Sequence, residues 1–237
     1  AGDEVSQNTR ANWYRGALEV SVYRTDAQQA RIPRDCKELV GAHVHAGHRS
    51  SKNCICAIAN KLASGSYALI QRRARGGALS ADDAHCIRAN ATCLQTFLWE
   101  LTQKYVNAKR FFWKRDFLPA FTAASIGAMC AMMISDQPAH QAIKRKLQSL
   151  FFTPAPSWQE LLNAFNSPHE KIYAWVQLDG RHSYIGSTRQ TDVWARWGQE
   201  YGQVRAIMAD KTKAKGHFRF EARMAKAGLK GFVPILL

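Results

Sequence analysis

The sequence predicts an α+β protein in which a mainly helical, basic N-terminal region precedes a small α/β segment with a short antiparallel sheet. Apolar residues recur at helical spacing between Ser80 and Phe165, and short β-type runs begin at Lys171. A proline-containing stretch separates the two patterns. We therefore expect a poorly defined basic segment over 1–79, a helical region over 80–165 and a separate unit over 171–237, with the boundary between Phe152 and Lys171.

The first 79 residues carry weaker patterns than the rest of the chain. The stretch 17–23 alternates like a half-buried strand, and 55–62 is expected to form a helix entered from a histidine-rich loop. The loop contains residue types that bind zinc, but HxHxxH followed by CxC is not the paired spacing of a zinc site. A histidine-rich loop beside buried cysteines is the favoured explanation, and a metal site is the alternative, formed by His43, His45, His48, Cys54 and Cys56.

A basic, glycine-containing run follows at 71–77, with the sequence QRRARGG. We expect a loop there. Arginine offers a planar fork that binds phosphate through two hydrogen bonds, so Arg72, Arg73 and Arg75 are candidate phosphate contacts. A solvated charged loop explains the same run equally well, and both explanations stay open.

The stretch from Ser80 to Phe117 has the clearest helical pattern. Ser80 and Asp83 match a capping box with Asp in place of Glu, and apolar residues then recur up to Tyr105. Near its end, basic residues alternate with aromatic ones, a pattern that can hold a phosphate backbone and stack on bases. An aromatic face buried beneath long basic side chains is the favoured explanation. The basic residues concerned are Lys109, Arg110, Lys114 and Arg115.

The stretch from Phe117 to Ser135 contains no charged residue and raises the question of a membrane span. It barely reaches the about 20 strongly apolar residues that a span needs, and its small residues suit close helix packing. We therefore expect a buried core helix. An amphipathic basic helix should follow over 137–152, and a capping box at Ser157 and Glu160 predicts a short helix ending near Phe165.

Two short β-runs joined by a tight turn begin the C-terminal segment. Lys171–Leu178 is rich in β-branched and aromatic residues, and Asp179-Gly180 suits a two-residue hairpin turn. His182–Ile185 should return as the partner strand, and the Gly-Ser-Thr sequence at 186–188 is expected to end it. Asp192 is placed to cap a helix that starts at the next residue.

This arrangement resembles the GIY-YIG endonuclease superfamily. The first tripeptide of the motif stands here as Lys171-Ile172-Tyr173, and the second as Tyr184-Ile185-Gly186. Arg196 follows ten positions after the glycine, in a Trp-Ala-Arg-Trp context similar to the family's first helix. The sequence GHFRFEARMAKAGLKGFVPILL, at 216–237, is similar to the family's second helix, glycine turn and third strand. The resemblance covers residues 171–237.

The resemblance implies phosphodiester hydrolysis with a bound divalent metal, Mg²⁺. On the positions that match the motif, Tyr173 and Tyr184 would be the paired tyrosines that help to activate water, and Arg196 would stabilise charge on the phosphate. In the family, a glutamate on the third helix holds the metal.

The chain departs from the family pattern at several positions. Lys171 replaces the first glycine, and Glu200 with Tyr201 beside it stands one turn after the arginine, where the family often has His or Tyr. The sequence ends at Leu237, where the third strand would end, and Glu221 falls on the second helix. We therefore expect the metal-binding glutamate to be missing and the chain to bind nucleic acid without cutting it efficiently.

The charge of the chain points to an acidic polymer as its partner. There are 33 Lys and Arg residues against 18 Asp and Glu, a formal charge of +15, and a pI near 9.8. The basic character is spread over both halves, and Arg189 after the hairpin adds to the candidate nucleic-acid contacts. Binding to an anionic membrane surface is the competing explanation of this charge, and a membrane partner is the less favoured one.

The cysteines and the N-terminus suggest a compartment. Six cysteines in 237 residues do not form a dense disulfide framework, which favours a reducing, intracellular location, either organellar (mitochondrial) or nuclear. The sequence starts with Ala1 and shows no signal-peptide pattern, which suggests a processed product or a piece of a longer protein.

Two classes of function agree with these observations. The first is a nucleic-acid-binding protein with a nuclease-like domain that is catalytically impaired, which includes an RNA-binding component of an organellar ribosome or other ribonucleoprotein, with further proteins as partners. The second is an active metal-dependent endonuclease domain of a larger mobile-element or repair protein. DNA or RNA as the target and the oligomeric state stay open.

Overall fold

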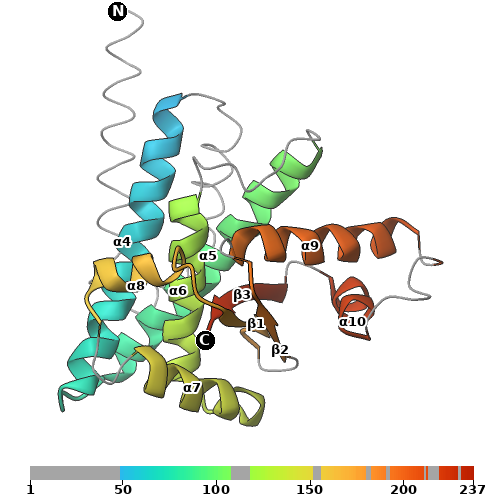
Figure 1. The fold of residues 1–237 in the computed structure, drawn as a ribbon. Coiled ribbons are helices and arrows are strands. Elements are labelled where there is room, and N and C mark those ends of the chain that lie inside the picture. Colours follow the sequence, from blue (N-terminus) through green and yellow to red (C-terminus); the bar gives the residue numbers. More distant parts are fainter. Residues whose placement is uncertain are drawn as a thin grey trace, which may run out of the picture.

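A computed structural model describes residues 49–107, 118–151, 156–179, 183–190, 193–210, 212, 219–228 and 231–237 (Figure 1). In these residues the chain is α+β, with helices first and a small antiparallel sheet among the last elements. This agrees with the predicted fold class. The predicted strand over 17–23 lies outside the described residues.

Three long helices form the helical part of the molecule. α4 (Arg49–Ala74) and α5 (Ala81–Asn107) both pack against α6 (Leu118–Met133), which runs between them in Figure 1. Residues 120–134, which cover most of α6 and the residue after it, are all buried. This confirms the predicted core helix. Such a helix must be apolar on every side because neighbours surround it. Within the described parts of the chain, no helix is both long enough and apolar enough to cross a membrane.

Both predicted capping boxes are present. The Ser80 hydroxyl accepts from the Asp83 backbone N–H at 3.0 Å, and the Asp83 carboxylate accepts from the Ser80 N–H at 3.0 Å. Ser157 and Glu160 form the same reciprocal pair at the start of α8 (Trp158–Ala164). These bonds satisfy N–H groups that a helix start leaves without partners, which is why the sequence signature alone locates both helices.

α4 is longer than the helix predicted over 55–62, and its end corrects the predicted loop at 71–77. Gln71–Ala74 belongs to the last turn of the helix, and only then does the chain turn, with Gly76 at φ +88°. The helix continues because its inner side is anchored. Tyr67 donates to the Pro156 carbonyl, and the Gln71 amide donates to the same oxygen at 2.9 Å. This long-range contact was not visible in the local sequence.

The helix predicted over 137–152 is divided in two. A single 3₁₀ turn, η2 (Pro138–His140), precedes α7 (Gln141–Phe151). His140 is fully buried, and its ring nitrogens lie 2.7 Å from the Ser135 hydroxyl and 2.9 Å from the Gln177 carbonyl. The imidazole therefore connects the chain after α6 to the end of the first strand.

The sheet has three antiparallel strands in the order β2-β1-β3. They are β1 (Lys171–Gln177), β2 (Ser183–Thr188) and β3 (Phe232–Leu236). The expectation that 186–188 would end the second strand was wrong, because these residues pair with the first three residues of β1. The hairpin continues to its open end since Gly186 lies opposite Tyr173 and, as described below, leaves room for the Tyr173 ring.

Two helices separate the hairpin from the last strand. α9 (Val193–Ala209) starts where the sequence predicted, and α10 (Arg219–Ala227) is followed by Gly228 at φ +84°. The Gly228 N–H donates to the Met224 carbonyl at 2.9 Å, which closes the helix in the left-handed conformation that glycine adopts readily. The expected helix, glycine turn and strand are therefore all present.

One hydrophobic core extends from α4 to β3. α6 packs against β3, and the Gln95 amide of α5 donates to the Gly231 carbonyl at 2.7 Å. An aromatic cluster also joins the helical part to α9 and the sheet: Phe121, Phe165, Tyr173, Trp175, Trp194 and Trp197. The helical region and the C-terminal segment thus share their packing. Whether the stretch between Phe152 and Lys171 also separates two units that fold independently stays a prediction.

Two helical glycines should respond to alanine in opposite ways. A Cβ at Gly127 would lie 2.5 Å from Leu94 Cδ1, whereas a Cβ at Gly65 meets nothing within 4 Å. We expect Gly127→Ala to destabilise the fold, because overpacking a core costs about 1–3 kcal/mol. Gly65→Ala should stabilise it by about 0.5–1 kcal/mol through helix propensity. Urea unfolding measures both, and equal shifts of the same sign would show that Leu94 yields without strain.

Candidate functional site

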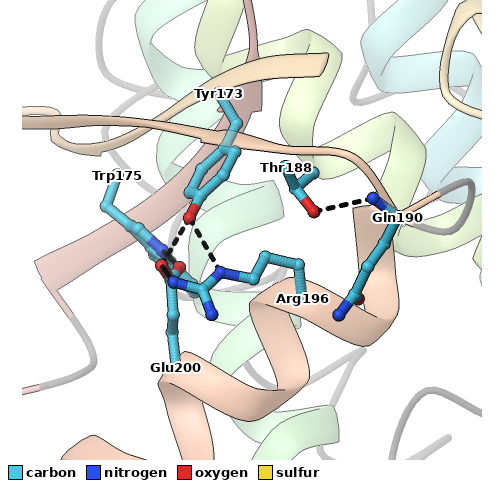
Figure 2. A network of polar contacts seen from close by, with 6 residues as sticks. All are labelled: Tyr173, Trp175, Thr188, Gln190, Arg196 and Glu200. Carbon is cyan, nitrogen blue, oxygen red and sulfur yellow. Dashed lines mark hydrogen bonds and ion pairs between the residues drawn. The ribbon is translucent and has the colours of Figure 1, made fainter. Parts of the chain in front are cut away.

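The hairpin register places the two motif tyrosines on one face of the sheet. Tyr173 lies opposite Gly186, and Trp175 lies opposite Tyr184, and residues paired across antiparallel strands project to the same side. α9 covers this face. Its Arg196 donates through Nε to the Tyr173 hydroxyl at 3.2 Å (Figure 2). The three predicted catalytic residues are therefore brought together as the sequence suggested.

Gly186 makes this arrangement sterically possible. A Cβ at position 186 would lie 2.8 Å from the Cζ and hydroxyl oxygen of Tyr173, and 3.0 Å from Cε1 of Tyr184. Real Cβ atoms do not approach heavy atoms this closely, so any larger residue would displace one of the rings. The glycine of the second tripeptide thus has a local packing reason in this chain.

A buried glutamate, Glu200, organises the polar groups on this face. Its side chain is 1% exposed, and Oε1 accepts from the Tyr173 hydroxyl at 2.5 Å. The same oxygen lies 3.1 Å from Arg196 Nη2, and Oε2 accepts from the Trp175 indole N–H at 2.7 Å (Figure 2). The sequence alone assigned no role to Glu200. Its spacing of one helical turn from Arg196 was the available signal, because residues four apart share a helix face.

Burial shifts the proton affinities of the groups on this face. It raises the pKa of Glu200, because a buried carboxylate loses solvation. It also raises the pKa of Tyr173, and the hydrogen bond to Glu200 adds to that shift, because the phenol donates its proton to a carboxylate. Tyr184 has a raised pKa as well, first from burial and then from the charge of Glu200. Tyr173 is therefore a protonated donor at neutral pH in this structure.

Arg196 keeps part of its guanidinium accessible. The side chain is 31% exposed, and its hydrogen bond to Tyr173 is the main reason that its pKa is raised. The N–H groups that do not contact Tyr173 or Glu200 have no hydrogen-bond partner in the described part of the chain. A guanidinium has five N–H donors in a planar fork, so Arg196 can still offer donors to an anion such as a phosphate oxygen.

Lys171, which replaces the first glycine of the motif, is compatible with the strand. It is 5% exposed and lies in ordinary β structure opposite Thr188. Its ammonium donates to the Ser167 carbonyl and, at 3.3 Å, to the His169 carbonyl. The lysine therefore fixes the loop that leads into β1. On the partner strand, Arg189 directly follows Thr188 at the end of β2, and its side chain is exposed.

The other predicted phosphate contacts are not gathered at this site. Arg72, Arg73 and Arg75 are exposed at the C-terminal end of α4, and Arg72 forms an ion pair with Asp83. In Figure 1 this end of α4 lies at the lower left, whereas α9 and α10 lie at the right. The remaining predicted contacts lie outside the described residues: Lys109, Arg110, Lys114 and Arg115.

The proposed zinc ligands are largely untested. His43, His45 and His48 lie outside the described residues, as does the side chain of Cys54, whereas Cys56 is partly buried on α4. In the described residues, no group of three or more His, Cys, Asp or Glu side chains could hold a metal ion. Of the other cysteines, Cys93 is disulfide-bonded and Cys130 is a buried thiol. The reducing compartment stays a prediction.

Two buried carboxylates, Glu221 and Glu200, fit the magnesium ion that the resemblance implies. Glu221 on α10 is 3% exposed, and its Oε2 has no hydrogen-bond partner in the described residues. Mg²⁺ prefers hard oxygen ligands and is often held by one or two carboxylates, so Glu221 and Glu200 would be its ligands here. When bound, such an ion would supply charge stabilisation next to a phosphate. The sequence analysis did not assign Glu221, and the structure indeed places it on the second helix of the segment.

Comparisons with protein-family models, with curated proteins and with solved structures found no match to this chain. The resemblance to nucleases therefore depends on the motif residues and on the geometry around them. Both are local features of residues 171–237, so they support a proposal about this part of the chain. We call the face of the hairpin and α9 that carries Tyr173, Tyr184, Arg196 and Glu200 the corner.

Alanine at position 186 should damage the corner specifically. We expect Gly186→Ala to destabilise the protein by about 1–3 kcal/mol, because the new methyl group overlaps the Tyr173 ring. Gly202→Ala on α9 is the matched control, since a Cβ there meets nothing within 4 Å. Urea unfolding and the near-ultraviolet circular dichroism of the aromatic groups report the effect. A Gly186→Ala protein as stable as the Gly202→Ala protein would contradict the assigned contact.

The phenol of Tyr173 should ionise only at strongly alkaline pH. Its raised pKa means that the folded state holds this proton more tightly than the unfolded state. The associated stability is present below a pH of about 10, the usual tyrosine pKa, and is lost as the pH rises through the folded value. The ultraviolet absorbance titration of wild type minus that of Tyr173→Phe reports the ionisation of this phenol. Its midpoint should lie above a pH of about 10 in the folded protein and at about 10 in denaturant. A folded-state difference centred at or below about 10 would contradict the Tyr173–Glu200 hydrogen bond.

Proposed function

We propose that this chain binds nucleic acid through a GIY-YIG nuclease-like corner, and that it cleaves phosphodiesters inefficiently as it stands. The observation that carries the proposal is the partly exposed Arg196, held beside Tyr173 on the face of the hairpin where Tyr184 also lies. These are the three residue types and relative positions that the resemblance assigns to phosphate chemistry. The described geometry supports the proposal because Arg196 contacts Tyr173 and Tyr184 lies on the same face of the hairpin.

The charge distribution supports binding. A protein with a formal charge of +15 attracts a phosphate backbone, and the α/β segment itself carries 12 basic and 5 acidic residues. Arg196 offers spare guanidinium donors, and the exposed Arg189 lies a few residues before it. Phosphate contacts of this kind position a nucleic acid and carry no base preference, so DNA and RNA are both candidate ligands.

The role of Glu200 supports weak cleavage. The Tyr173 proton is committed to Glu200, and the raised pKa of the phenol opposes its use as a base at neutral pH. Glu200 also neutralises part of the Arg196 charge. A positioned general base contributes about 10²–10⁴-fold to a rate, so its loss weakens a hydrolytic enzyme strongly.

The alternative is an active metal-dependent endonuclease domain of a larger mobile-element or repair protein. The 2.5 Å bond from Tyr173 to Glu200 favours this candidate, because a carboxylate that accepts the phenolic proton can assist its transfer. A role as an RNA-binding component of an organellar ribosome or another ribonucleoprotein is a form of the first proposal, and its proteins would be further partners. The RNA arms of the experiment below test it.

Binding should depend on salt and on Arg196. We expect fluorescence anisotropy with duplex DNA, single-stranded DNA and structured RNA to show an affinity that falls steeply as salt rises from about 50 to about 200 mM. Arg196→Ala should weaken binding and reduce the salt slope by about one. Arg196→Lys controls for the charge, and Arg145→Ala on α7 is a charge-matched exposed control. Affinity that ignores salt, or equal losses for Arg196→Ala and Arg145→Ala, would contradict the proposed interface.

Cleavage is measured on the same proteins with plasmid DNA and structured RNA in the presence of Mg²⁺ or Mn²⁺. The proposal expects little or no nicking by residues 1–237. Robust cleavage that Arg196→Ala abolishes would instead establish the endonuclease alternative. Binding to anionic lipid vesicles without binding to any nucleic acid would overturn both.

A further inference from the structure

Glu221 carries a buried carboxylate oxygen without a hydrogen-bond partner among the described residues. The side chain lies in the first turn of α10 and is 3% exposed, and Met224 one turn later is fully buried. This side of α10 therefore faces the interior. Its Oε2 has no hydrogen-bond partner in the part of the chain that the structure describes. Buried carboxylates are normally paired or bound to a metal, because an isolated buried charge is strongly unfavourable.

The surroundings of Glu221 place it beside the Glu200 network. Phe220, the preceding residue, stacks on Tyr184 with ring centroids 3.9 Å apart and nearly parallel planes. Tyr184 lies opposite Trp175, whose indole donates to Glu200. This series of contacts brings the first turn of α10 next to β2 and to the part of α9 that carries Glu200. Electrostatic interactions of Glu221 with Glu200 and with Tyr184 agree with this placement.

The charges in this region do not balance among the described residues. Glu200 and Glu221 are two buried carboxylates from different helices, and Arg196 pairs with Glu200 alone. The Glu200 Oε2 accepts one hydrogen bond, from Trp175, and a carboxylate oxygen can accept more than one contact. Oxygen atoms with unused capacity on two buried carboxylates of neighbouring helices are suited to a cation.

We propose that Glu200 and Glu221 together bind a hard divalent cation, Mg²⁺ or Mn²⁺, between α9 and α10 beside Tyr184. Mg²⁺ needs few protein ligands, because it keeps several of its waters and accepts one or two carboxylates. In the resembled family the metal ligand is on the third helix, so a site that uses the second helix is specific to this chain. The site goes beyond the proposed function, since it depends on the two carboxylates and not on nucleic-acid binding.

The test is a titration of the 1–237 chain with Mn²⁺ in the absence of nucleic acid. Electron paramagnetic resonance detects the free and bound ion. We expect saturable binding that Mg²⁺ displaces. Glu221→Gln should weaken it by about tenfold or more, because even changes outside the ligand shell weaken metal sites by that factor. Glu170→Gln is the matched control, since Glu170 is an exposed carboxylate, and it should bind Mn²⁺ like the wild type. Absent saturable binding, or equal affinity in Glu221→Gln and wild type, overturns the proposal.

Thermal unfolding provides a second arm that does not depend on a measured affinity. In the presence of a chelator, Glu221→Gln should unfold at the same temperature as wild type or higher, because it removes an unbalanced buried charge. Mn²⁺ should raise the unfolding temperature of wild type and of Glu170→Gln, but not of Glu221→Gln. A lower unfolding temperature for Glu221→Gln in chelator, together with no effect of Mn²⁺ on wild type, would show that a basic side chain neutralises Glu221 and would overturn the proposal. Because no nucleic acid is present, absence of cation binding leaves the proposed nucleic-acid binding untouched. Absence of nucleic-acid binding likewise leaves the proposed cation site untouched.

Discussion

The burial of one carboxylate is the constraint on which the C-terminal segment depends. Glu200 is 1% exposed, so its charge has to be compensated by groups of the protein rather than by water. The compensation comes from Tyr173 and Trp175 on β1 and from Arg196 on the same helix. Each donor is held at a defined position relative to the others. The orientation of α9 on the sheet and the clustering of the motif residues are therefore two consequences of the same requirement.

The aromatic cluster connects the C-terminal segment to the helical part of the chain. Trp197 packs against Tyr173 and Trp175, and Trp194 contacts Phe165 and Phe121 of the preceding elements. Large rings bury much apolar area, and edge-to-face pairs add a geometric preference. α6, which packs against β3, thus supports the sheet from the helical side. The helical region thus packs behind the elements that carry the candidate site.

The same glutamate that orders the corner also limits its chemistry. A phenol that donates to a buried carboxylate is well positioned but keeps its proton, and a guanidinium beside that carboxylate has less charge to offer a phosphate. For this reason we propose binding rather than efficient bond cleavage. The second buried carboxylate, Glu221, changes this balance only if a cation joins the two acids, and so the electrostatics around Glu200 decide which function the corner can have.

Much of the local structure could be predicted because its causes are local. The capping boxes at Ser80 and Ser157 are reciprocal bonds within four residues, and the hairpin that places the motif tyrosines on one face of the sheet follows from strand alternation and a short turn. The extension of β2 through Gly186 and the burial of Lys171, Glu200 and Glu221 were decided only by tertiary structure. A carboxylate or an ammonium has the same identity in water and in the interior, and only the packing of distant elements determines which of them is buried and what must satisfy it.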